Sequence, residues 1–479
     1  MNFTSIDFLI FFPATVLVYF LFPPKIRWVV LLASSYFFYI NVKPVYVFLL
    51  LGVTTSTYFL AILMGSTRNE NRRRAYAITN IILVLLPLGF YKYFPDINTG
   101  MRNLLQHFGL RWPLPDISLI LPIGISFYTF TSIGYTMDVY NEEIEPERHF
   151  GIFSLFISFF PLLLAGPIER APHMLPQFRK PHRFNYDMAV SGFRLMLWGY
   201  LMKLVAADRI HIYLYNVMAD VPRYSGFTLL VASYLHPFEI YADFGGYSLI
   251  AMGCARVLGL EVMNNFNRPF FATSIAELWR RWHISLILWL TDYVYTPLAF
   301  YFRRFKIWGI VISIIITFVL SGLWHAAAWT FLTWGLLQGI FLSVEALTRN
   351  RRDDFQNKYQ LRKKRWFRFL SILTTITLLA ASDIFGNAKD VPQALEILHK
   401  IVTHPVGHLF LFEVHTFVLG VSGALLILVK DFLDEYYPDQ FHLMDHRNPL
   451  IRYFAYSSIV LLILLFGVFD GGQFIYFHF

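Results

Sequence analysis

Residues 307–344 read IWGIVISIIITFVLSGLWHAAAWTFLTWGLLQGIFLSV and contain no Asp, Glu, Lys or Arg. A membrane-spanning helix needs about 20 mostly apolar residues, so this stretch is long enough to cross a bilayer twice. The stretch has no polar loop, and its only break is the sequence LSGLWH at residues 320–325. It therefore predicts a helical hairpin in a membrane, with His325 at the turn.

The composition of the whole chain agrees with a membrane location. Of the 479 residues, 56% are hydrophobic and 15% are charged, whereas soluble domains have about 45–50% apolar and about 25% charged residues. We expect about 11 true crossings, and the shorter apolar runs are expected to be re-entrant or interfacial. The predicted apolar runs are 6–22, 28–40, 45–64, 77–93, 117–136, 150–166, 188–206, 226–241, 246–263, 284–301, 307–323, 326–344, 369–386, 409–429 and 453–470.

The basic residues give the expected orientation of these runs. The net charge is +9, but the Lys and Arg residues cluster between apolar runs, which is typical of cytoplasmic loops and not of nucleic-acid binding. Lys25 and Arg27 follow the first run, so we expect the N-terminus outside. Three runs separate the first two basic loops, so one of them, 150–166, should enter and leave on the same side. The four basic loops are 68–74, 170–183, 303–306 and 349–368.

His325 is the strongest candidate for a catalytic residue. Ionisable side chains at membrane depth are expensive and by default mark function. A histidine shielded from water stays neutral, and a neutral imidazole is a suitable general base near pH 7. The alternative is a histidine that only forms a hydrogen bond with a neighbouring helix. Its position at the break of the hairpin favours the catalytic interpretation.

His283 is the second candidate and lies in the sequence ELWRRWHISL at residues 277–286. Arg280 and Arg281 precede it, and guanidinium groups suit the binding of phosphates and carboxylates. The alternative is a cytoplasmic anchor whose arginines extend toward water. A simple count of spans places this segment outside, so a cytoplasmic position requires that 284–301 and one earlier run do not cross.

A third cluster is the sequence YADFGGYS, residues 241–248, between two apolar runs. Its acid, Asp243, is expected either to orient a histidine or to pair with an arginine. Gly245 and Gly246 allow a tight turn or the close approach of a ligand. The only cysteine, Cys254, excludes an intramolecular disulfide and is expected to be a packing residue.

Several classes of protein lose support because their motifs are absent from the sequence. It has no G-x-S-x-G, P-loop or H-E-x-x-H motif, which disfavours a serine hydrolase, an ATP-driven pump and a zinc protease. His404 and His408 are four residues apart, but Pro405 between them makes a continuous helical metal site unfavourable. We therefore expect no metal.

These segments together resemble the membrane-bound O-acyltransferase family, and most closely its bacterial alginate O-acetyltransferase branch. The similarity extends over nearly the whole chain, and the WRRWH and GLWH motifs are specific in combination. The segments that carry it are LPIGISFY (121–128), AGPI (165–168), YADFGGYS (241–248), ELWRRWHISL (277–286), DYVYTPL (292–298), SGLWH (321–325) and FIYFHF (474–479).

The resemblance implies an all-α polytopic membrane protein, with a ring of tilted transmembrane helices and re-entrant segments around a central tunnel. It implies a single domain over residues 1–479, with N-terminal helices in 1–110, a catalytic core in 117–345 and C-terminal helices in 369–479. It also implies a multi-pass protein of the bacterial inner membrane, for which we expect both termini outside.

The resemblance further implies that His325 is the catalytic histidine and His283 the second histidine of the tunnel. The donor is then cytoplasmic acetyl-CoA, and the acceptor is an extracytoplasmic polysaccharide such as alginate, cellulose or peptidoglycan. A periplasmic SGNH-type acetyltransferase is the implied partner. Contacts with the donor are expected from Tyr241, Asp243, Arg280, Arg281, Trp282 and Trp324. The alternative function is a transporter or export channel for polysaccharide or acyl groups, and a purely structural scaffold is a third possibility.

Overall fold

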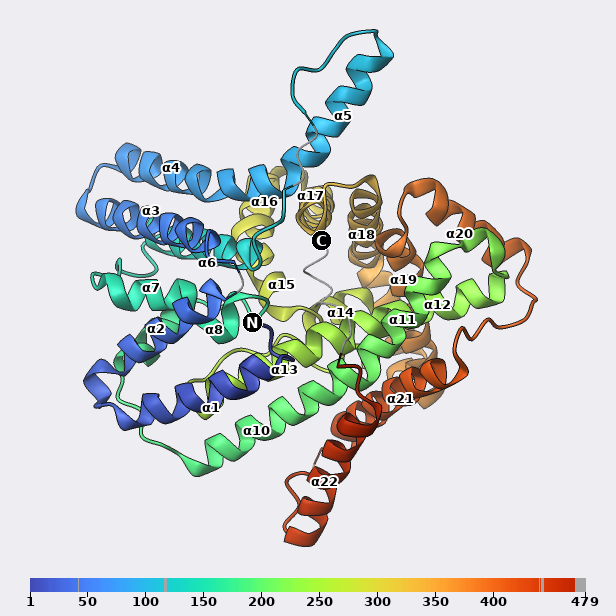
Figure 1. The fold of residues 1–479 in the computed structure, drawn as a ribbon. Helices are drawn as coiled ribbons and strands as arrows, with labels where there is room; N and C mark the ends of the chain where they lie inside the picture. The colour runs from blue at the N-terminus through green and yellow to red at the C-terminus, as the bar shows by residue number, and fades with distance from the viewer. Residues whose placement is uncertain (42, 116–118, 439, 441–442, 470–479) are drawn as a thin grey trace. The chain divides into compact units, whose positions relative to one another are not determined.

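The computed structural model describes residues 1–41, 43–115, 119–438, 440 and 443–469, and within these ranges the regular structure is helical (Figure 1). Eight helices in this part of the chain are long and apolar enough to cross a membrane. The prediction of an all-α polytopic membrane protein is therefore confirmed, while the number of crossings stays a prediction. The chain divides into two compact units, Met1–Met196 with Ile250–Met263, and Leu197–Leu249 with Asn264–Phe479.

In the first unit, α3, α4 and α6 pack together and α2 packs against α7. Polar side chains join these apolar helices: Asn80 Nδ2 donates to Thr136 Oγ1 at 2.6 Å, and the hydroxyls of Tyr36 and Ser154 lie 2.9 Å apart. Such hydrogen bonds link helices in lipid. The helices are α1 (Ile6–Leu21), α2 (Arg27–Ile40), α3 (Tyr46–Ser66), α4 (Glu70–Leu88), α5 (Phe94–His107), α6 (Ile125–Tyr140), α7 (Phe150–Ser158), α8 (Phe160–Leu163) and α9 (Ala171–Arg179).

The predicted re-entrant run 150–166 forms the two short helices α7 and α8. At about 1.5 Å per residue, the nine residues of α7 cover about 14 Å, about half of the hydrocarbon thickness of a bilayer. Neither helix is long enough to cross alone, as the prediction of a same-side segment requires.

The second unit contains the hairpin and the segments that carry the candidate residues. In it α12 packs against α11, α19 and α20, and α18 packs against α17 and α19. Its helices are α11 (Asp208–Ala219), α12 (Gly226–Ile240), α14 (Ile275–Arg281), α15 (Ile284–Leu290), α16 (Thr296–Tyr301), α17 (Ile307–His325), α18 (Trp329–Lys358), α19 (Arg365–Asn387), α20 (Val391–Thr403), α21 (Val414–Tyr436) and α22 (Pro449–Phe466), with π-helical turns η3 (Met202–Ala207), η5 (Tyr241–Gly245) and η7 (Thr291–Tyr295). Two helices continue across the division between the units, α10 (Tyr186–Leu201) and α13 (Gly246–Val257).

The predicted hairpin is confirmed, and its two helices pack backbone against backbone. A Cβ atom added to Gly322 of α17 would lie 2.2 Å from the Phe331 carbonyl oxygen. A Cβ atom added to Gly335 of α18 would lie 2.3 Å from the Phe318 carbonyl oxygen. Small residues permit such close approach of membrane helices. The hairpin therefore fixes where α17 ends, at His325.

Some predicted boundaries are wrong. The helix that contains the run predicted for 188–206 continues to Ala219. Within this helix Lys203 and Asp208 form an ion pair of 2.8 Å. The run predicted for 246–263 is helical only to Val257, and Gly259 then takes a left-handed conformation with φ +85°. The resembling segment 474–479, residues 117–118 of the predicted run 117–136 and residue 470 of the predicted run 453–470 lie outside the described residues.

Candidate active site

The two predicted histidines line one cavity in the second unit. The cavity is partly open, and the space between its walls, counted together with the open solvent at its mouth, is about 630 Å³. Helices α12, α14, α15, α17, α18 and α19 contribute side chains to it. The lining residues are His236, Ile240, Trp279, Trp282, His283, Leu286, Ser321, His325, Phe331, Trp334, Leu379, Asp383 and Gly386.

His325 is the last residue of α17 and is half-buried among aromatic rings. Its ring centroid lies 4.6 Å from that of Trp324 and 5.3 Å from that of Trp334. Residues 326–328 then interrupt the helix before α18 begins. The prediction that His325 lies at the break of the hairpin is confirmed, and the break opens on a cavity.

His283 lies between α14 and α15 and is 2% exposed. It has a left-handed backbone with φ +45°, which is unusual for a residue other than glycine. Asn265 fixes this turn, because its backbone oxygen accepts from Ile284 N at 2.9 Å and its Oδ1 accepts from Ser285 N at 3.2 Å. The ring of Trp324 lies 6.1 Å from that of His283 and 4.6 Å from that of His325, so one indole contacts both histidines.

Burial determines the protonation state of the His283 imidazole. It lowers the pKa of the imidazole to about 3, so the ring is neutral at physiological pH. A neutral imidazole at this position can donate or accept a hydrogen bond without bringing charge into the cavity.

We expect acidification to destabilise the protein through His283. Its pKa is depressed in the folded state, so below the normal value of about 6.5 the unfolded chain binds a proton that the folded chain does not. Between pH 7.5 and pH 5 this difference costs about 2 kcal/mol, and a His283→Gln variant should lose correspondingly less stability. Thermal melting in detergent at the two pH values measures the difference. An equal loss in both proteins would contradict it.

Hydrogen bonds among α14, α18 and α19 hold the aromatic walls of the cavity. Trp279 Nε1 donates to Gln338 Oε1 at 3.1 Å, and Gln338 Nε2 donates to Ser382 Oγ at 2.8 Å. Trp334 Nε1 donates to Asp383 Oδ1 at 2.8 Å. The sequence analysis missed Asp383 and His236 as lining residues. The available signal was their position as ionisable residues inside the apolar runs 369–386 and 226–241.

Asp243 pairs with a lysine, a partner that the sequence analysis did not consider. Its Oδ1 lies 2.6 Å from Lys203 Nζ, which also bonds Asp208 Oδ1 at 2.8 Å. All three side chains are at most 6% exposed. The sequence analysis did not consider Lys203, which lies within the predicted run 188–206. Tyr241, at the start of the same turn, donates to Asp431 Oδ2 at 2.7 Å.

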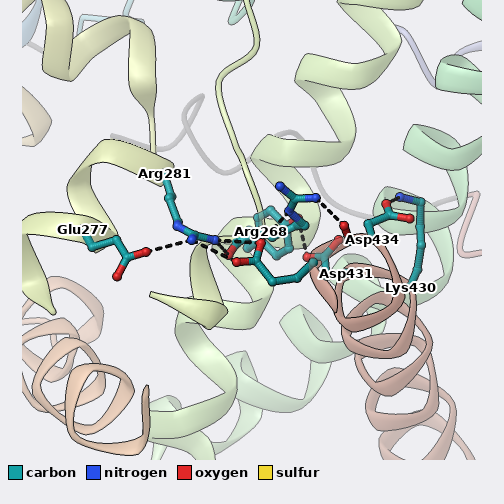
Figure 2. A network of polar contacts seen from close by, with 8 residues as sticks. Arg268, Glu277, Arg281, Lys430, Asp431 and Asp434 are labelled. Carbon is teal, nitrogen blue, oxygen red and sulfur yellow. Dashed lines mark hydrogen bonds and ion pairs between the residues drawn. The ribbon is translucent and has the colours of Figure 1, made fainter. Parts of the chain in front are cut away.

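Arg281 takes part in a network of carboxylates that joins α14 to α21 (Figure 2). Its Nη1 and Nη2 each lie 3.0 Å from one oxygen of Glu435, and Nη2 donates to Glu277 Oε1 at 2.7 Å. Arg268 Nε also contacts Glu435, at 3.0 Å. Arg281 therefore positions the turn that carries Trp282 and His283, whereas the neighbouring Arg280 is exposed.

Fold and cavity together define a polytopic helical membrane protein with two histidines in one aromatic cavity. Residues 148–378 match the model of the membrane-bound O-acyltransferase family. The chain is 33% identical over 389 residues to the probable alginate O-acetylase AlgI of Azotobacter vinelandii, covering 80% of this chain and 76% of that protein. It is 31% identical over 407 residues to the peptidoglycan O-acetyltransferase of Helicobacter pylori, covering 79% and 74%.

A more distant similarity is to the teichoic acid D-alanyltransferase of Bacillus subtilis, at 27% identity over 326 residues, which cover 63% of this chain and 81% of that protein. The chain belongs to the membrane-bound O-acyltransferase family and is an O-acyltransferase. The sequence-based assignment to the AlgI-like part of this family is confirmed.

Proposed function

We propose that this enzyme transfers acetyl groups from cytoplasmic acetyl-CoA to hydroxyls of an extracytoplasmic polysaccharide. The observation that carries the proposal is the meeting of His325 and His283 in one cavity at the break of a membrane hairpin. Acetyl as the acyl group is supported by the higher identity to O-acetyltransferases than to the D-alanyltransferase. The bacterial inner membrane and a periplasmic SGNH-type partner complete the proposal.

The proposed reaction needs one base and one polarising group. His325 removes the proton from the acceptor hydroxyl, the oxygen attacks the thioester carbonyl, and the C–S bond breaks. The CoA thiolate then takes up a proton. Neutral His283 donates a hydrogen bond to the thioester oxygen, where negative charge develops. The aromatic rings of Trp282 and Trp324 exclude water from the thioester, which would otherwise be hydrolysed.

The proposed contacts with the CoA phosphates are assigned mainly to Arg280. Its side chain is exposed, whereas Arg281 would have to give up its pairs with Glu277 and Glu435 to bind a phosphate. Arg281, Tyr241 and Asp243 then act indirectly, by holding the helices next to the cavity. The two arginines are given different roles because carboxylates of the protein already neutralise the charge of Arg281, whereas Arg280 is exposed.

The test is release of CoA from acetyl-CoA by purified membranes without any ion gradient. We expect Arg280→Ala to raise KM for acetyl-CoA about tenfold, because a charged hydrogen bond contributes about 1.5–3 kcal/mol. The matched control is Arg351→Ala, an exposed arginine of α18, which should leave KM unchanged. Absence of CoA release by the wild-type protein, with or without added polysaccharide and periplasmic extract, would reject the acetyl-CoA proposal.

A further inference from the structure

A chain of hydrogen bonds connects the catalytic cavity with the surface of the second unit. His236 of α12 lines the cavity with His325. His236 Nδ1 lies 3.1 Å from Glu239 Oε2, and Glu239 Oε1 lies 2.6 Å from His211 Nδ1 on α11. The side chains of His236 and Glu239 are each 5% exposed, whereas that of His211 is 41% exposed. The chain therefore begins at the buried cavity and ends at a side chain on the outside of the second unit.

The chemistry of the three groups suits the movement of a proton. Both imidazoles use Nδ1 toward the same carboxylate, which leaves Nε2 of His236 for the cavity and Nε2 of His211 for the surface. The Glu239 carboxylate is shared by the two rings, with one oxygen toward each of them. The Glu239 carboxylate can take the proton from Nδ1 of His236 and then pass it to Nδ1 of His211 in the tautomer in which that nitrogen carries no hydrogen.

Two other roles fit these residues less well. A metal site is not supported, because the described residues contain no group of three or more His, Cys, Asp or Glu that could hold a metal ion. The second alternative is a purely structural link between α11 and α12. Such a link needs only Glu239 and His211, and it does not explain why His236 lies at the cavity wall. Asp383 lines the same cavity and interacts electrostatically with His236.

We propose that His236, Glu239 and His211 form a proton relay between the catalytic cavity and the surface. The inference rests on the proposed acetyl transfer, in which the acceptor hydroxyl loses a proton and the CoA thiolate gains one. A proton that His325 has taken from the hydroxyl passes to Nε2 of His236, and one proton leaves from Nε2 of His211 to water. The thiolate takes a proton from water on its own side, so the reaction balances although its two protons are exchanged at different places.

The decisive variant is Glu239→Gln, which keeps the shape of the side chain but cannot carry the proton. We expect kcat for CoA release to fall about tenfold, with KM for acetyl-CoA within about twofold of wild type, because the donor contacts are untouched. The matched control is Glu413→Gln. Glu413 also pairs with a histidine, His415, at 3.3 Å, but both side chains are at least half exposed and neither lines the cavity.

A second variant covers the case in which Glu239→Gln does not fold. His211→Ala changes a partly exposed side chain, and added imidazole should restore at least half of the lost kcat by replacing the surface end of the relay. A purely structural role predicts no such rescue. Wild-type kcat in both variants, or a loss in His211→Ala that imidazole does not restore, would overturn the relay. These outcomes are separate from failure of the proposed function, in which the wild-type protein itself releases no CoA from acetyl-CoA.

Discussion

Replacement of His325 by alanine should reduce kcat for acyl transfer by a factor of about 10² to 10⁴, the usual contribution of a positioned general base. The imidazole is the only ionisable group in residues 307–344, and it lies at the open break between α17 and α18. The KM for the donor should change little, since the base acts on the acceptor. Release of CoA from acetyl-CoA in membranes measures both constants.

The control for this variant is His399→Ala, which removes an exposed histidine of α20. It should keep wild-type activity. A His325→Gln variant separates chemistry from packing, because glutamine fills much of the same space and forms hydrogen bonds but is no base at neutral pH. Wild-type turnover in His325→Ala would refute the assigned role. Full activity in His325→Gln together with a loss in His325→Ala would show that the histidine acts only by hydrogen bonding and not as a base.

Replacement of Lys203 by methionine should cost about 3–5 kcal/mol of stability, the largest loss that we expect for a single polar substitution. Lys203 is the shared partner of Asp208 and Asp243, and its removal leaves two buried carboxylates without their common cation. The ion pairs join the π-helical turns η3 and η5, so their loss should also loosen α12 beside the cavity. Thermal melting of the purified protein in detergent measures the effect.

A compensated variant tests the explanation for this loss. Lys203→Met combined with Asp208→Asn and Asp243→Asn removes all three charges, and it should recover most of the stability, because an uncharged buried cluster carries no unpaired ion. The control is Lys180→Met, an exposed lysine whose replacement should change stability by less than about 0.5 kcal/mol. A single variant Lys203→Met that melts like wild type would show that the triad contributes nothing.

The hairpin and its histidine were predictable because both depend on local sequence. Uninterrupted apolarity over 307–344 indicates two membrane helices, and a break with one ionisable residue marks the turn. The family assignment was equally accessible, since the WRRWH and GLWH motifs lie in continuous segments. The joint position of His283 and His325 in one cavity was expected only from the resemblance, because 41 residues separate them in the chain.

The partners of the charged residues were not predictable, because each pair joins segments that are distant in sequence. Arg281 forms an ion pair with Glu435, and Asp243 forms one with Lys203. A pattern of charges along one chain does not specify which of several carboxylates meets which cation.

The tight contact of Gly322 and Gly335 has a consequence for how the enzyme accommodates different acyl groups. A side chain at either glycine would collide with a carbonyl oxygen of the other helix, so the position of His325 depends on two residues that cannot be enlarged. His283, in contrast, sits on a short connector held by side chains such as Asn265 and Arg281, which can be exchanged singly during evolution. Divergence toward a bulkier or charged acyl substrate should therefore proceed by remodelling that connector, while the hairpin stays as it is.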